Sequence, residues 1–139
     1  MKIEDRAWQM FARYIKLRDC NQYGYGKCID TGAPIFYYRK DGRWCSSSDA
    51  GHYISREIKT IMFDEDNVHA QSIKGNRFNW TFSNYRENLI IKIGLERVLE
   101  LEEEKRLYGI GKSYHENNYE EILEIYTKKV ELCLVNKMF

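Results

Sequence analysis

The chain concentrates its turn-forming residues in one stretch, residues 19–51. This stretch holds the only proline, Pro34, and five of the nine glycines: Gly24, Gly26, Gly32, Gly42 and Gly51. Glycine and proline favour turns and interrupt helices, so no long helix is expected here. The β-forming run at residues 35–38 precedes Asp41-Gly42, and an Asp-Gly pair after such a run is typical of a β-hairpin. We therefore predict two short strands, the second leading through Trp44 to His52.

Helical periodicity flanks this stretch on both sides. Residues 4–18 place apolar side chains on one face at three- and four-residue intervals, namely Trp8, Phe11, Ala12 and Ile15. Residues 81–108 repeat such a pattern, and Gly94 within it favours a break into two helices. A last helix is predicted over residues 117–135, with Asn117 or Asn118 as its N-cap. The sequence thus predicts an α+β fold in which a small strand core is flanked by an N-terminal helix and C-terminal helices.

The length of 139 residues suits one domain with one core. We divide it into a leading helix (1–19), a strand and loop core (20–80) and a helical C-terminal part (81–139). Aromatic residues make up 14% of the chain, which is typical of a folded domain rather than a disordered one. No apolar run reaches the roughly 18 residues of a membrane span, and the first ten residues include acidic ones, unlike a signal peptide. We therefore expect a cytoplasmic protein without membrane contact.

Charge is distributed unevenly, although the formal net charge is only +1. Residues 1–93 hold 15 Lys and Arg against 11 Asp and Glu, whereas residues 94–139 hold 7 against 10. A weakly basic body with an acidic C-terminal third permits contact with phosphates on one face. The four cysteines include no CxxC pair, and in a cytoplasmic chain they do not indicate a disulfide framework.

Side chains suited to chemistry gather in three blocks of the irregular middle. These are Asp49-Ala50-Gly51-His52-Tyr53, then residues 63–71 (Phe-Asp-Glu-Asp-Asn-Val-His-Ala-Gln), then Gly75-Asn76. By itself an Asp-x-x-His is common on protein surfaces, but the three blocks occur together and in order. Here the chain resembles the NinG family of lambdoid phages, which carries matching blocks and then a Tyr-Arg and an Ile-Gly on a helix. Tyr85-Arg86 and Ile93-Gly94 match those two, so the resemblance covers roughly residues 8–101.

NinG-like proteins look like HNH endonucleases, whose ββα-metal unit is two strands and a helix around one divalent cation. Hydrolysis of a phosphodiester needs a base that takes a proton from water. The resemblance implies that His52 is this base, since an imidazole titrates near neutral pH. It also implies that Asn67 holds the loop and orients the imidazole through its side-chain amide.

The metal ligands implied by the resemblance are Asp49 and Asn76. Carboxylate and amide oxygens suit a hard cation, Mg²⁺ or Mn²⁺. His69 is either a further ligand or a structural hydrogen-bonding residue, and both readings stay open. Because Asp49 and His52 point to opposite faces of a regular strand, we expect a bend or bulge at Gly51.

The chain departs from the family at its structural zinc site. NinG-like sequences carry two CxxC pairs that bind Zn²⁺. In this chain the four ligand positions are Cys28, Thr31, Ser72 and Gly75. Hydroxyls and a glycine do not replace thiolates, so we expect the structural zinc to be lost; Cys20 and Cys45 could rebuild a site with Cys28, but at separations unlike a zinc knuckle. We expect surplus aromatic residues around the former site to compensate: Tyr37, Tyr38, Trp44, Phe78, Trp80 and Phe82.

The resemblance predicts a metal-dependent endonuclease that acts on phage recombination or replication intermediates, branched DNA such as a Holliday junction in particular. Two alternatives remain open: a catalytically silent module that binds DNA junctions or single strands, and a protein-interaction or inhibitory role. Basic side chains near the motif are expected to hold DNA phosphates, namely Arg56, Lys59, Lys74, Arg77 and Arg86. The expected setting is the cytoplasm of a phage-infected or lysogenic bacterium. The sequence leaves the oligomeric state open, a homodimer included.

Overall fold

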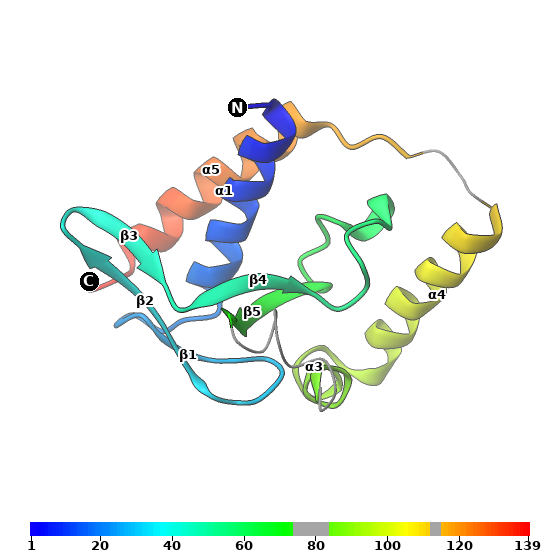
Figure 1. The fold of residues 1–139 in the computed structure, drawn as a ribbon, viewed down its shortest axis with the longest axis horizontal. Helices are drawn as coiled ribbons and strands as arrows, with labels where there is room; N and C mark the ends of the chain where they lie inside the picture. Colours follow the sequence, from blue (N-terminus) through cyan, green and yellow to red (C-terminus); the bar gives the residue numbers. More distant parts are fainter. Residues whose placement is uncertain (74–83, 112–114) are drawn as a thin grey trace.

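The computed structural model describes residues 1–73, 84–111 and 115–139. Within these residues the chain is α+β, as predicted, with helices on either side of two small antiparallel sheets. Helix α1 (Ile3–Arg18) lies along helix α5 (Tyr119–Val135), and the strands lie at the other side of α1 (Figure 1). None of the helices in this described part is long and apolar enough to cross a membrane.

Helix α1 buries the apolar face that its periodicity predicts. Phe11 and Ile15 are fully buried and pack against Val68 and against Tyr126 of α5. The rings of Phe11 and Tyr126 meet edge to face with their centroids 4.7 Å apart, a favoured aromatic geometry. The helix thus lies between the sheet that contains Val68 and α5.

The first sheet is a meander of β1 (Tyr25–Lys27), β2 (Pro34–Lys40) and β3 (Arg43–Ser46). Asp41 and Gly42 join β2 to β3 with φ values of 53° and 76°, as a two-residue Asp-Gly hairpin requires. The predicted hairpin is confirmed. Its second strand is shorter than predicted, because β3 ends at Ser46 and does not continue to His52.

A serine-rich bend separates the two sheets. The Ser46 hydroxyl accepts a hydrogen bond from the Ser48 amide (3.1 Å), and Ser47 bonds through its hydroxyl to the amide of Phe36 (2.8 Å). Such local side-chain bonds compete with the strand ladder. The chain therefore leaves the first sheet here, and the next strand, β4 (Ser48–His52), pairs with β5 (Val68–Ser72) instead.

Strand β5 was not predicted as a strand from its own residues. Val68, His69, Ala70 and Gln71 alternate between apolar and polar, but the segment is short and contains one β-branched residue, so its strand signal is weak; in the structure four of its five residues are buried. A long loop joins β4 to β5 and contains a short 3₁₀ turn, η1 (Lys59–Ile61). This hairpin carries most of the predicted site.

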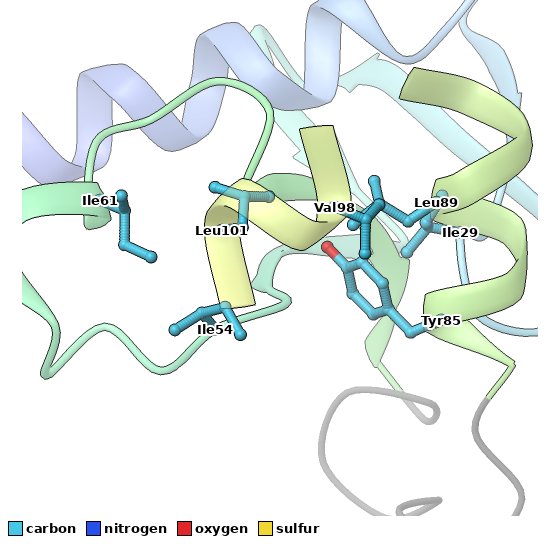
Figure 2. Packing of buried hydrophobic residues seen from close by; sticks show 7 residues of the cluster. All are labelled: Ile29, Ile54, Ile61, Tyr85, Leu89, Val98 and Leu101. Atoms are coloured by element: carbon cyan, nitrogen blue, oxygen red, sulfur yellow. The ribbon is translucent and has the colours of Figure 1, made fainter. Parts of the chain in front are cut away.

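A second core joins that loop to α3 (Tyr85–Ile93) and α4 (Leu95–Gly111). Gly94, with φ of 92°, separates the two helices, so the predicted break is confirmed. Figure 2 shows Val98 and Leu101 of α4 between the loop and α3. The buried members of this core are Ile29, Ile54, Ile61, Tyr85, Leu89, Val98 and Leu101.

The last helix begins as predicted. The Asn118 side chain accepts a hydrogen bond from the Glu121 amide (3.1 Å) and so caps α5. Glu120 and Glu121 lie in the first turn, where negative charge interacts favourably with the helix dipole.

Candidate functional site

A hollow of about 640 Å³ lies between α1 and β4, and we call it the α1–β4 hollow. It is lined by Trp8, Gln9, Ala12, Arg13 and Lys16 of α1, by Asp49, Ala50, Gly51 and His52 of β4, and by Arg56. The two β4 residues that the sequence singles out, Asp49 and His52, therefore line one space. Of the ionisable groups around it, three are cationic side chains and one is a carboxylate.

Strand β4 brings Asp49 and His52 to this hollow without any bulge. The ladder is one-to-one from Ser48 opposite Ser72 to His52 opposite Val68, so of the expected bend or bulge at Gly51 the bulge is absent. The hollow receives residues from both faces of β4, which is why adjacent positions line it. Gly51 is needed for a different reason, since a Cβ there would lie 2.2 Å from the side-chain oxygen of Gln71.

The imidazole of His52 is held on two sides. Its ring stacks on that of Trp8 with the centroids 4.9 Å apart, and its Nε2 lies 3.0 Å from the carbonyl oxygen of Met62. A carbonyl only accepts hydrogen bonds, so Nε2 carries the proton and Nδ1 keeps a lone pair. Burial, with the nearby charges of Arg56 and Lys59, lowers the pKa of His52 below 6.5. The ring is consequently neutral and basic at neutral pH.

Asn67 is fully buried and bonds only to backbone groups of the loop in the contacts described. Its amide nitrogen donates to the carbonyl oxygens of Ile54 (3.0 Å) and Ile61 (3.1 Å), and its oxygen accepts from the Ile54 amide (2.8 Å). Asn67 thus holds the loop, as the sequence suggested. Its influence on His52 is indirect, since it fixes Ile61 next to the Met62 carbonyl rather than bonding to the imidazole.

His69 lies within a buried polar cluster beside the end of α1 and helix α3. Its Nε2 donates to the Asp66 carbonyl (2.8 Å), and its Nδ1 accepts from Lys92 (2.8 Å) and Arg18 (3.1 Å). Burial and the charge of Lys92 lower the pKa of His69 to about 4. With both ring nitrogens bonded to protein groups, His69 fits the structural reading and not that of a metal ligand.

Asp19 completes this cluster and carries its negative charge. Its carboxylate accepts hydrogen bonds from Arg18 (2.8 Å), Lys92 (3.0 Å) and the Ala70 amide (2.8 Å). Burial opposes ionisation, but these donors hold the pKa of Asp19 at about 2. The Arg18, Asp19, His69 and Lys92 cluster therefore ties the end of α1 to β5 and α3 as a structural unit.

Asp49 is the predicted metal ligand that the structure places at the hollow. The other, Asn76, lies outside the described residues. Across residues 1–73, 84–111 and 115–139, no three His, Cys, Asp or Glu side chains form a group able to hold a metal ion. A hard cation would therefore need Asp49 together with a ligand such as Asn76.

The predicted phosphate-binding residues have different surroundings. Arg56 lines the hollow with its guanidinium 5.3 Å from the centre of the Trp8 ring, and the Lys59 ammonium lies 3.8 Å from the Met62 sulfur. Arg86 instead bonds twice to Glu102 (2.8 and 3.1 Å), so a carboxylate already neutralises it. Lys74 and Arg77 lie outside the described residues.

Sequence reasoning missed Arg13 and Lys16, which line the hollow from α1. The prediction for this helix depended on the spacing of its apolar residues alone. Gln9, Arg13 and Lys16 repeat at the same three- and four-residue intervals, so the polar face carried an equivalent signal.

Three of the four positions of the family's zinc ligands, Cys28, Thr31 and Ser72, lie close together in the fold. Cys28 is buried, its Sγ accepts a hydrogen bond from the Ser72 amide (3.2 Å), and it lies 3.7 Å from the Ser72 hydroxyl. Burial raises the pKa of the Cys28 thiol, but hydrogen bonds from Thr31 and Ser72 outweigh this and lower it. Gly75 lies outside the described residues. Among the described residues, hydrogen bonds thus join Cys28, Thr31 and Ser72 at positions where the family has zinc-binding thiolates.

Of the six aromatic residues expected to compensate at this place, Tyr37 and Trp44 belong to another cluster and Tyr38 is exposed. Tyr37 and Trp44 stack on each other and pack with Phe139, in a cluster separate from that of Cys28. Phe78, Trp80 and Phe82 lie outside the described residues. Cys20 belongs to the Tyr37 cluster, so it does not adjoin Cys28 in a common site.

We expect the purified protein to contain much less than one equivalent of zinc and to keep its fold in EDTA. Thr31 and Ser72 offer neutral hydroxyls where the family has thiolates, and these bind zinc weakly. Elemental analysis and circular dichroism with and without EDTA measure both properties. Stoichiometric zinc, or unfolding on chelation, would contradict the prediction.

Comparison with known proteins gives one significant result. A family model described as bacteriophage lambda NinG protein matches residues 1–133. No curated protein and no solved structure matches the chain significantly.

Proposed function

Because the chain belongs to the bacteriophage lambda NinG family, we propose that it is a metal-dependent, HNH-type DNA endonuclease. Membership suggests a role related to phage recombination. Recombination and replication pass through branched DNA, so we take branched DNA as the substrate. The hairpin of β4 and β5, with a long loop between the strands, is compatible with the first two elements of a ββα-metal unit.

The observation that carries this proposal is the state of His52. The Met62 carbonyl holds the Nε2 proton, so Nδ1 keeps the lone pair that a general base needs. Burial keeps the imidazole neutral at the pH of a cell. Stacking on Trp8 fixes the ring plane at the wall of the hollow. A base that deprotonates water must be neutral, oriented and accessible, and His52 combines these properties.

The cationic side chains of the hollow suit the phosphodiester of the substrate. Arg13, Lys16 and Arg56 line the same space as His52. Guanidinium and ammonium groups hold a phosphate in place and stabilise the negative charge that develops on it. In the proposed reaction they bind the phosphodiester while His52 takes the proton from the attacking water.

Asp49, with Asn76 as a second ligand, would hold the cation of the proposed enzyme. Mg²⁺ or Mn²⁺ bound there would neutralise charge on the phosphate during hydrolysis. Lys16 lies near Asp49, and the charge of Asp49 opposes the loss of the Lys16 proton that burial favours. Asp49 therefore also helps to keep Lys16 charged for phosphate binding.

We expect the protein to cut a four-way DNA junction in the presence of Mg²⁺ or Mn²⁺ and to leave it intact in EDTA. A linear duplex of the same sequence serves as the comparison substrate, and denaturing gels measure strand cleavage. Absence of cleavage with either metal would contradict the proposal. Salt-dependent DNA binding without cleavage would then favour the catalytically silent binding module, and absence of binding would favour a protein-interaction role.

A further inference from the structure

Helix α1 contributes to two hollows that share Gln9 and Arg13. One is the α1–β4 hollow. The other, of about 400 Å³, is lined by Arg6, Gln9, Met10 and Arg13 of α1 and by Leu123 and Thr127 of α5. Arg6, Gln9, Arg13 and Lys16 follow one another at three- and four-residue intervals, so they lie on one face of the helix. This polar face is therefore continuous from the second hollow to the one that contains His52.

Among the described residues, Arg6 and Arg13 of this face form no ion pair, and neither does Arg56 on the loop that lines the same hollow. The charge of Asp49 acts on Lys16, the remaining cation of the face. Arginines elsewhere are paired, as Arg86 is with Glu102 and Arg106 with Glu103. Unpaired cations on one face raise the local positive potential, which attracts a polyanion.

Charge is distributed in the opposite sense on the far part of the molecule. A hollow along α4 is lined mainly by glutamates, namely Glu96, Glu100, Glu102, Glu103 and Glu104. Glu100, Glu102 and Glu103 pair with arginines, but Glu96 and Glu104 form no ion pair among the described residues, so the α4 side attracts a polyanion less than the α1 side does. The weak net charge of +1 conceals this asymmetry.

We propose that Arg6, Arg13 and Lys16, here named the α1 stripe, bind successive phosphates of the DNA strand that enters the α1–β4 hollow. This inference rests on the proposed function. Ten residues of helix separate Arg6 from Lys16, a span of about 15 Å. Phosphates of one strand rise by about 3.4 Å each along the duplex axis and lie farther apart than this along the backbone, so the stripe has the reach of about three phosphates.

The stripe also accounts for how a phosphate reaches His52, the proposed general base. Arg13 and Lys16 line the hollow together with His52, whereas Arg6 lies at the second hollow. A strand bound along the stripe therefore passes from the groove between α1 and α5 to the imidazole. The stripe binds and positions the substrate, and the proton transfer remains with His52.

The test measures DNA binding of the full chain in EDTA, where no cleavage is needed. A fluorescein-labelled four-way junction and a linear duplex are titrated at several NaCl concentrations, and anisotropy gives the association constant. When the logarithm of the association constant is plotted against the logarithm of the salt concentration, each phosphate contact contributes about 0.9 to the slope. We expect Arg13→Gln with Lys16→Gln to reduce the size of the duplex slope by about 1.8, and Arg6→Gln alone by about 0.9.

A matched control removes the same charge elsewhere. Arg106→Gln with Lys128→Gln neutralises two exposed cations of α4 and α5 that pair with Glu103 and Glu124, and it should leave the slope unchanged. Arg13→Lys with Lys16→Arg keeps both charges and should keep the slope. A wild-type slope in the glutamine variant overturns the inference, as does a loss of slope in the charge-preserving variant.

Two further outcomes bear on the occupant and on the proposed function. Poly-glutamate that binds as tightly as DNA, with the same dependence on the stripe, would overturn DNA as the ligand and favour an acidic protein. A protein whose slope depends on the stripe but that never cuts DNA supports the inference and contradicts the nuclease. One that cuts DNA while the glutamine variant keeps its slope supports the nuclease and contradicts the inference.

Discussion

Replacing His52 with alanine is expected to reduce the rate of DNA cleavage by about 10²–10⁴-fold, the usual contribution of a general base. Affinity for DNA should stay nearly unchanged, because a base lowers the barrier and contributes little to ground-state binding. Single-turnover cleavage with saturating protein measures the first property. Anisotropy in EDTA measures the second. A variant that cuts DNA as fast as the wild type would contradict the assignment of His52 as the general base.

Two variants separate catalysis from folding. His115 is exposed and lies outside the hollow, so His115→Ala should cleave at the wild-type rate. His52→Gln keeps much of the side-chain volume beside Trp8 and should fold while losing the base. Loss of cleavage in a folded His52→Gln protein supports catalysis. Wild-type cleavage by that variant would leave His52 as a buried structural residue.

The pH dependence of the wild type provides an independent readout of the same group. Because burial lowers the pKa of His52, its neutral form persists below pH 6.5. The pH at which the cleavage rate falls to half its plateau should therefore lie below 6.5, and His52→Gln should lack this decline. A wild-type decline centred above pH 6.5 would show that another group limits the reaction.

Replacing Asn67 with alanine is expected to produce the largest loss of stability. The change leaves the Ile54 amide and the carbonyls of Ile54 and Ile61 without their partner in a buried place. Each buried polar group left unpaired costs roughly 1–3 kcal/mol, so the free energy of unfolding should fall by about 3 kcal/mol or more. Urea unfolding followed by circular dichroism measures the change.

Asn136 provides the matched control for this prediction. It is exposed at the end of α5, where its amide makes one long contact of 3.5 Å with the Leu132 carbonyl. Asn136→Ala should therefore change the free energy of unfolding by no more than about 0.5 kcal/mol. Equal unfolding curves for the Asn67 and Asn136 variants would show that the loop does not depend on Asn67.

Local signals in the sequence were sufficient for much of the fold. The Asp41-Gly42 turn, the helix break at Gly94 and the N-cap at Asn118 each depend on a residue and its immediate neighbours. Strand β5 was missed because its five residues include one β-branched residue and no aromatic residue, so the strand signal is weak. The change of sheet at Ser47 was missed because its hydrogen bonds reach back to Phe36.

The candidate site was predictable from the sequence only in part, since Arg13 and Lys16 of the hollow were missed. Family resemblance singled out Asp49 and His52, and both line the hollow. The surroundings of His69 depend on Arg18 and Lys92, which lie 51 and 23 residues away along the chain. No sequence pattern near His69 contains this information, because distant helices supply the two cations.

Through the loop between β4 and β5, the hydrogen bonding of the His52 imidazole depends on the core formed with α3 and α4. Ile54 and Ile61 belong to the core with α3 and α4, while His52 and its strand pack against α1. A fluctuation that opened the α3–α4 core would release Ile61, and with it the neighbouring Met62 carbonyl that sets the His52 tautomer. Amide protons of this loop should then exchange together with those of α3. The capacity of His52 Nδ1 to accept a proton therefore depends on the stability of α3 and α4, which pack against the loop and not against the imidazole.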